Sequence, residues 1–236
     1  MKILALETSA VACSACLCED ETVLAQTYQN SGLTHSRTLL PMVQNLLADS
    51  GHGLEEVDVI AVAAGPGSFT GLRIGAATAK GLAWGGRKRC APCSTLESMA
   101  WPLAHLEDQL IVCAMDARRA QVYNALFLAR GNRPERLCPD RAVSLAELGE
   151  ELKKYQKMKI VVGDGAMLCY NTLREEVPGL SLAPVHLRMQ SAWGVARAAE
   201  DLAAGGGLVT AADLAPVYHR LSQAERERLE REQNLR

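Results

Sequence analysis

The sequence carries no excess of basic charge. Its 236 residues include 25 Lys and Arg against 27 Asp and Glu, and the formal net charge at pH 7 is −2. Binding to a phosphate backbone needs clustered cations, because each Lys or Arg that neutralises a phosphate releases the counterions held there. If nucleic acid takes part in the function, another component is therefore expected to supply most of the contact.

Long apolar runs are missing as well. No stretch approaches the roughly 18 apolar residues that a membrane-spanning helix needs. Glu7 interrupts the apolar start of the sequence, whereas the core of a secretory signal needs about 7 to 15 apolar residues. We therefore expect a cytoplasmic protein with no membrane partner.

The spacings typical of several catalytic sites are also absent. No two of the five histidines lie three or four positions apart, which excludes a metal-binding histidine pair on one helix. Ser68 lies in GPGSFTG, which lacks the glycine two positions after the serine that a nucleophile elbow needs. We therefore predict no catalytic residue and no metal site.

Cysteine, by contrast, is plentiful, with eight residues. Two CxxC pairs, Cys13 with Cys16 and Cys90 with Cys93, keep zinc as an alternative. Residues 10–18 read as a strand, however, and side chains three apart on a strand point to opposite faces. We favour small, buried, reduced core thiols for these positions.

The first hundred residues have the pattern of an α/β unit. Three short apolar stretches predict a meander of strands at residues 2–8, 10–18 and 21–29. Apolar spacing of three and four predicts a helix over 33–51, and the continuous apolar run at 57–64 predicts a buried strand. A glycine-rich loop and a second predicted helix over 68–85 follow. A further short strand and a helix beginning near Thr95 are predicted next.

The second half repeats this order. Strands and helices are predicted in turn at residues 108–115, 120–129, 145–155, 159–165 and 166–176. The repetition predicts two similar lobes, residues 1–105 and 106–236. A helix over 191–204 follows, and the charged segment at 223–233 predicts either a solvated helix or a tail that docks a partner.

The loop AGPGSFTGLRIG, residues 64–75, is compatible with anion binding. Glycines before a helix let an anion approach the free N–H groups of the first turn. The ending of a P-loop is missing, because Leu72 and Arg73 stand where Lys and Ser or Thr are needed. Another polar turn, in MDARRAQVY, either orients a substrate or forms a local ion pair. The candidate anion-binding or nucleotide-binding residues are Gly65, Ser68, Thr70, Arg73, Asp116 and Arg118.

The same loop starts a regular pattern of small residues. Gly67, Gly71, Gly75 and Ala79 recur every four positions, which on a helix forms one stripe with almost no side chain. Such a stripe lets another element approach closely. Two interpretations stay open: the stripe packs inside its own domain, against residues 36–49, or it contacts another subunit.

Six motifs, in this order, resemble the TsaB (YeaZ) family over nearly the whole chain. They are ILALETS, HSRTLLPMVQNLL, AAGPGSFTGLRIG with AKGLA, CSTLESMA, MDARRAQVY and LAPVYHR. The resemblance implies an α/β, actin-like (ASKHA, ribonuclease H-like) duplicated fold with two βββαβα lobes. It also implies a partner protein in forming N6-threonylcarbamoyladenosine, next to the anticodon of tRNAs that read codons beginning with A.

The resemblance implies partners too. In this family's pathway, TsaD transfers threonylcarbamoyl from threonylcarbamoyl-AMP to tRNA and works with TsaB and the ATPase TsaE. ATP and threonylcarbamoyl-AMP are then used by the complex, this chain alone holds no cofactor tightly, and it meets tRNA only through the complex. Helices at 33–50 and 68–85 pair with TsaD, or with a second copy when TsaD is absent. The predicted partner-binding residues are Leu39, Val43, Leu46, Gly67, Gly71, Leu72, Gly75 and Ala79.

The chain departs from catalytic relatives at two places. The metal-binding HxxxH of TsaD falls, in our register, at Thr95 and Met99. The first phosphate loop of actin-like ATPases reads D-x-G-T, whereas Glu7, Thr8 and Ser9 stand here without the glycine. We expect a catalytically inactive paralogue of TsaD. The alternatives are a metal-dependent glycopeptidase-like enzyme and an actin-like small-molecule kinase.

Overall fold

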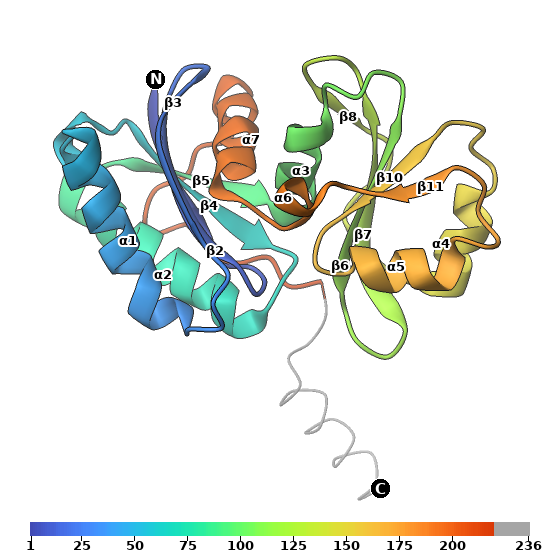
Figure 1. Cartoon of the computed structure of the whole chain (residues 1–236). Helices are drawn as coiled ribbons and strands as arrows, with labels where there is room; N and C mark the ends of the chain where they lie inside the picture. The colour runs from blue at the N-terminus through green and yellow to red at the C-terminus, as the bar shows by residue number, and fades with distance from the viewer. Residues whose placement is uncertain (220–236) are drawn as a thin grey trace, which may run out of the picture.

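The structure, a computed structural model, describes residues 1–219 as two lobes, each built on one β-sheet (Figure 1). The first sheet has the order β3-β2-β1-β4-β5. Its strands are β1 (Lys2–Glu7), β2 (Cys13–Glu19), β3 (Thr22–Gln29), β4 (Val59–Gly65) and β5 (Arg89–Ser94). The predicted antiparallel meander of β1, β2 and β3 is confirmed, and β4 and β5 add in parallel.

Helices cover both faces of the first sheet. The central strands β1 and β4 are buried along their whole length, as their continuous apolar sequences predict. Helices α1 (His35–Ser50) and α2 (Phe69–Gly86) cover one face, and α7 (Ala192–Ala204) covers the other. Cys13 and Cys90 belong to the first core, whereas Cys16 and Cys93 belong to the second. The prediction that Cys13 and Cys16 point to opposite faces of a strand is therefore confirmed, and Cys90 and Cys93 divide in the same way.

The second sheet has the order β11-β10-β6-β7-β8, with β9 paired to β7. Its strands are β6 (Leu110–Asp116), β7 (Gln121–Ala129), β8 (Pro134–Arg136), β9 (Arg141–Ser144), β10 (Lys159–Val162) and β11 (Leu180–Leu182). Helices α4 (Leu145–Leu152) and α5 (Ala166–Leu173) cover one face, and α3 (Thr95–Ala100) covers the other. A single turn, α6 (Val185–Arg188), and 3-10 turns at Leu54–Glu56 and Trp101–Leu103 complete the elements of the described chain.

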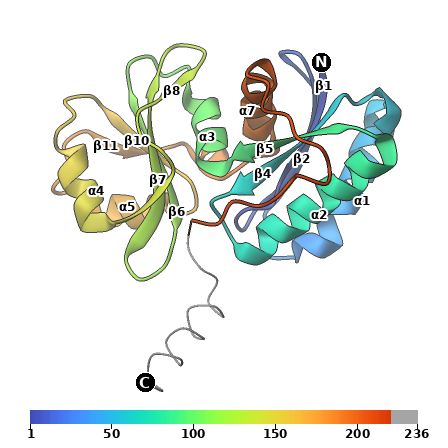
Figure 2. The ribbon, with the colours of Figure 1, turned by 180° about the vertical axis from the view of Figure 1, so that it is seen from behind.

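Two helices lie between the sheets and tie the lobes together (Figures 1 and 2). Helix α3 packs on the second sheet, whereas α7, which follows that sheet in the chain, returns to the first. The helices approach so closely that a Cβ at Gly194 would lie 1.9 Å from the Ser98 carbonyl oxygen. The predicted division at residue 105 stays a prediction, but α7 packs with the first lobe rather than the second.

Two expectations concern other parts of the chain. Within residues 1–219, no helix is long and apolar enough to cross a membrane. The predicted charged helix or docking tail at 223–233 lies outside the described residues.

Candidate functional site

The stripe of small residues on α2 faces the end of β1. A Cβ at Gly71 would lie 2.1 Å from the Thr8 carbonyl oxygen, and one at Gly67 would lie 2.6 Å from the Ser9 carbonyl oxygen. The Thr8 hydroxyl donates to the Gly71 carbonyl (2.8 Å), and the Ser68 N–H donates to the Ser9 carbonyl (2.7 Å). Glycine is therefore required here because two backbones are in direct contact. The stripe packs inside its own lobe: its glycines meet Thr8 and Ser9, which directly follow β1, and Ala79 shares a core with α1.

The predicted partner-binding residues lie on the sheet-facing sides of α1 and α2 and in the loop before α2. On α1 the side chains of Leu39, Val43 and Leu46 are buried in the core between helix and sheet. On α2, Gly71, Leu72, Gly75 and Ala79 are buried and Gly67 is half-buried. The apolar periodicity identifies the buried side of an amphipathic helix, and these residues have no accessible side chain with which to contact a partner.

A second set of small residues on α2 points outward. Ala77, Gly81 and Gly85 are exposed, and no atom of the described chain lies within 4 Å of a Cβ placed at Gly81 or Gly85. Helix α1 lies beside α2 on the same face of the sheet (Figure 1) and exposes Leu40 and Gln44. We call these five residues the outward face. Ala77, Gly81 and Gly85 are also spaced by four in the sequence, but they form a shorter stripe than the one that begins at Gly67.

The C-terminal segment crosses the start of α2. The Val217 N–H donates to the Ala64 carbonyl (2.7 Å), and a Cβ at Gly65, where φ is +139°, would lie 2.2 Å from the Val217 carbonyl oxygen. Arg73 donates from Nε to the Tyr218 hydroxyl (3.1 Å), and its guanidinium lies 3.8 Å from the centre of the Phe69 ring. This segment therefore lies against the first residues of the candidate anion loop, and Arg73 already has partners.

The remaining candidate anion-binding residues have local partners or lie apart. The Ser68 hydroxyl caps α2 by accepting from the Gly71 N–H (3.3 Å), while Thr70 is exposed. In the β6–β7 turn, Asp116 accepts from the Arg118 N–H (2.7 Å). Asp116 and Arg118 therefore bond to each other within their own turn, and the other four candidates, Gly65, Ser68, Thr70 and Arg73, lie in or just before the first turns of α2.

A pair of carboxyl groups lies where the two lobes meet. Glu7, at the end of β1, is fully buried and accepts from the Ser9 N–H at 2.5 Å, while its Oε2 has no partner among residues 1–219. Burial, with a smaller contribution from the nearby Asp164 carboxyl, raises the pKa of Glu7 to about 7. Burial also raises the pKa of Asp164, which accepts from Gln190 Nε2 at 2.7 Å. The segment that matches the first phosphate loop therefore places a buried carboxyl, Glu7, near the Asp164 carboxyl of the other lobe.

The raised pKa of Glu7 predicts a pH-dependent stability. Between pH 4.5, its usual value, and about 7, the folded chain keeps the proton that the unfolded chain has lost. Folding stability therefore falls as pH rises through this window, by on the order of 3 kcal/mol for a shift of this size. We expect Glu7→Gln to remove most of this decline and to be the more stable protein at pH 8. Urea unfolding at intervals from pH 5 to 8.5 measures it.

The matched control for this measurement is Glu55→Gln, which removes the same charge from an exposed position. It should leave the shape of the pH profile unchanged. An equal decline in wild type and Glu7→Gln would show that Glu7 is ionised in the folded protein.

The positions that match the TsaD histidines lie inside α3. Thr95 and Met99 are buried, and the Thr95 hydroxyl has no partner among residues 1–219. Residues 1–219 contain no cluster of three or more His, Cys, Asp or Glu side chains that could hold a metal ion.

Comparison with known proteins places the chain in a family. A model of the TsaD family, described as tRNA N6-adenosine threonylcarbamoyltransferase, matches residues 23–205. The tRNA threonylcarbamoyladenosine biosynthesis protein TsaB of Bacillus subtilis (strain 168) is 34% identical over 232 residues, which cover 95% of this chain and 96% of that protein. This chain belongs to the TsaB (YeaZ) family. TsaB of Escherichia coli (strain K12) is 40% identical over 128 residues, 54% of this chain and 55% of that protein.

Solved structures agree with the TsaB assignment. YeaZ from Pseudomonas aeruginosa superposes with a TM-score of 0.74 at 26% identity, covering 92% of this chain and all 100% of that one. The βββαβα order recurs in both lobes, apart from additional short strands in the second. The actin-like duplicated fold expected for the TsaB family is therefore confirmed.

Proposed function

We propose that this chain is a non-catalytic subunit required for forming N6-threonylcarbamoyladenosine, beside the anticodon of tRNAs that read codons beginning with A. The observation that carries the proposal is the near-complete alignment with a protein named for tRNA threonylcarbamoyladenosine biosynthesis. The match to the TsaD family supports a common origin with the transferase. The chain acts in the cytoplasm and reaches tRNA through its complex with TsaD.

Two features of the interior support the absence of catalysis. The buried Glu7 and Asp164 carboxyls meet where an actin-like ATPase would hold phosphates, and a phosphate beside them would be repelled whenever either acid ionises. Thr95 and Met99 replace the metal-binding histidines of TsaD and are buried in α3. In our proposal, ATP and threonylcarbamoyl-AMP are used by the complex, and this chain alone holds neither tightly.

The outward face is the proposed contact for TsaD. Its small residues leave the backbone of α2 open, which lets a partner helix approach within the 8–10 Å axis separation of packed helices. Leu40 is 44% exposed at the same face and offers an apolar side chain to bury there. A second copy of this chain occupies the face when TsaD is absent, and TsaE joins the assembled pair.

Reconstitution tests the proposed function. Purified chain, TsaD, TsaE, ATP, threonylcarbamoyl-AMP and unmodified tRNA are combined, and the modified nucleoside is measured by mass spectrometry after digestion. We expect modification to require every protein, and the lone chain to produce none. Equal modification without this chain would overturn the role. Tight ATP binding by the lone chain in calorimetry would overturn the assignment of nucleotide to the complex.

A further inference from the structure

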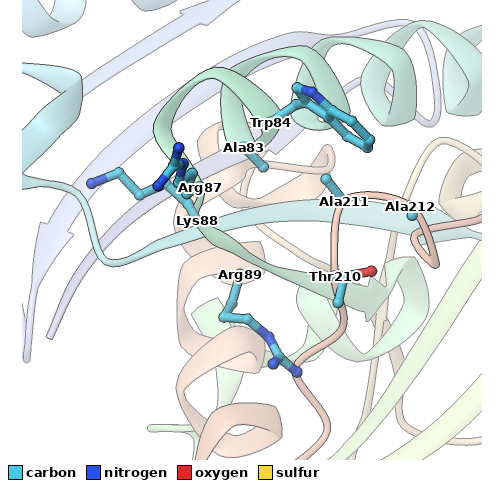
Figure 3. A pocket seen from close by; sticks show the side chains of 8 residues that line it. All are labelled: Ala83, Trp84, Arg87, Lys88, Arg89, Thr210, Ala211 and Ala212. Carbon is cyan, nitrogen blue, oxygen red and sulfur yellow. The ribbon is translucent and has the colours of Figure 1, made fainter.

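A pocket of about 390 Å³ opens at the C-terminal end of α2 (Figure 3). One side is formed by the last turn of the helix and the residues after it, and the other by a loop near the end of the described chain. The lining residues are Ala83, Trp84, Arg87, Lys88, Arg89, Thr210, Ala211 and Ala212. Strand β5 holds the two sides together, because Cys90 and Val209 exchange backbone hydrogen bonds of 2.9 Å.

The pocket is lined by cations without carboxylate partners. Lys88 Nζ donates to the Glu55 carbonyl (2.7 Å), and Arg89 donates to the Leu208 carbonyl. At the rim, Lys80 Nζ donates to the Ala212 carbonyl (3.3 Å). In the described part of the chain, none of these cations, nor Arg87, forms an ion pair. Two acidic residues bond to the lining: Glu55 through its main-chain carbonyl, and Asp213, whose carboxylate accepts from the Thr210 hydroxyl (2.6 Å).

Two of these cations, Lys80 and Arg89, lie near the buried Cys90 thiol. Burial raises the pKa of the Cys90 thiol, whereas the positive charges of Lys80 and Arg89 lower that pKa. Cations near the last turn of α2 also oppose the partial negative charge of the helix C-terminus, which accounts for the position of Arg87. That effect does not account for the aromatic side chain beside them.

Trp84 is the most exposed of the three tryptophans. It is 71% exposed, whereas Trp101 is 4% exposed and Trp193 packs against the core under α7. Figure 3 shows its indole at the pocket, on the same helical end as Arg87. A flat aromatic ring beside unpaired cations is the arrangement by which proteins hold unpaired nucleotides, with the base stacked on the ring and the phosphate at the cations.

We propose that this pocket binds an unpaired nucleotide of tRNA, with the base on Trp84 and the phosphate between Arg87 and Arg89. The proposal rests on the proposed function, which brings tRNA to the complex. A net charge of −2 excludes strong binding by the whole surface, but a local cluster adds one anchoring contact to those that TsaD makes. A free nucleotide shares the same chemistry, so the test separates the two sources.

The test uses the complex of this chain with TsaD and fluorescently labelled tRNA. We expect Trp84→Ala to weaken tRNA binding about tenfold and Trp84→Phe to restore most of it, because stacking tolerates any aromatic ring. Arg87→Ala with Arg89→Ala should reduce the slope of log affinity against log salt by about 0.7, because the one phosphate contact of the pocket is lost. The control, Lys154→Ala with Arg174→Ala, removes two exposed cations from the second lobe and should change neither quantity.

A second readout follows Trp84 fluorescence in the assembled complex of this chain with TsaD. Unlabelled tRNA should quench an emission component that is missing from Trp84→Ala, while ATP at the same nucleotide concentration should not. Equal quenching by ATP would assign the pocket to a free nucleotide and overturn the tRNA contact. Trp84→Ala could instead weaken association with TsaD while the assembled complex binds tRNA with unchanged affinity. That result would assign Trp84 to the protein interface and would also overturn the tRNA contact.

The two proposals fail in different ways. If the pocket variants bind tRNA like wild type while modification still requires this chain, the pocket proposal alone is wrong. If modification proceeds without this chain while Trp84→Ala still weakens tRNA binding, the proposed function alone is wrong.

Discussion

Gly71→Leu is expected to unfold the first lobe, whereas Gly81→Leu, on the same helix, is expected to leave it folded. A Cβ at Gly71 lies 2.1 Å from the Thr8 carbonyl oxygen, a backbone atom that cannot rotate away as a side chain can. Thr8 follows the buried strand β1, so relief of the clash would require moving the centre of the sheet. Overpacking usually costs about 1–3 kcal/mol, and here we expect more than about 4 kcal/mol.

Gly81 is the matched control for this substitution. No described atom lies within 4 Å of its Cβ position, so a leucine fits there. Leucine also has a higher helix propensity than the glycine that it replaces. We therefore expect Gly81→Leu to raise the free energy of unfolding by up to about 1 kcal/mol. Urea unfolding and thermal melts of both variants make the comparison. A Gly71→Leu protein with the same melting temperature as the wild type would show that α2 does not lie against the end of β1 as described.

Gly81→Arg is expected to abolish association with TsaD while the isolated chain stays folded. The substitution places a long, charged side chain at the centre of the outward face, where a partner helix needs a small residue to approach. We expect at least a hundredfold loss of affinity, because closest-approach positions tolerate no bulk and the buried charge would have no partner. Size-exclusion chromatography of the mixed proteins and calorimetric titration measure it.

The control for association is Ala146→Arg, which adds the same side chain at an exposed position of α4 in the second lobe. It should bind TsaD like wild type. In the absence of TsaD, Gly81→Arg should also abolish the homodimer that we propose for the wild type. An intact TsaD complex of a folded Gly81→Arg protein would place the interface elsewhere.

The two glycines show how far sequence reasoning reaches at this site. Spacing by four predicts a small-residue stripe wherever it occurs, and α2 carries two, one with Gly71 and one with Gly81. Both lie on a helix that the apolar pattern predicts correctly. Which stripe faces inward depends on where the end of β1 lies, and that strand is more than sixty residues away in the chain. Local periodicity contains no information about that contact.

Glu7 and Asp164 show the same limit in the chemistry. The sequence identifies Glu7 as a departure from an ATPase phosphate loop, since it lies in a short local motif. It gives no indication that Asp164, from the other lobe, shares its surroundings or that burial raises the pKa of Glu7 to about 7. A pKa depends on the charges and solvent around a group in space, so only the folded chain determines it.

By itself, the sequence determined the strand meander, the positions of the main helices, the repeated α/β order and the family, because each depends on local periodicity or on contiguous motifs. Only the tertiary structure decided which side of α2 is free, that α7 packs with the first lobe, and that Trp84 lies beside unpaired cations at an open pocket. These features arise where segments distant in the chain meet, and a contact between distant segments is a property of their packing rather than of either one alone.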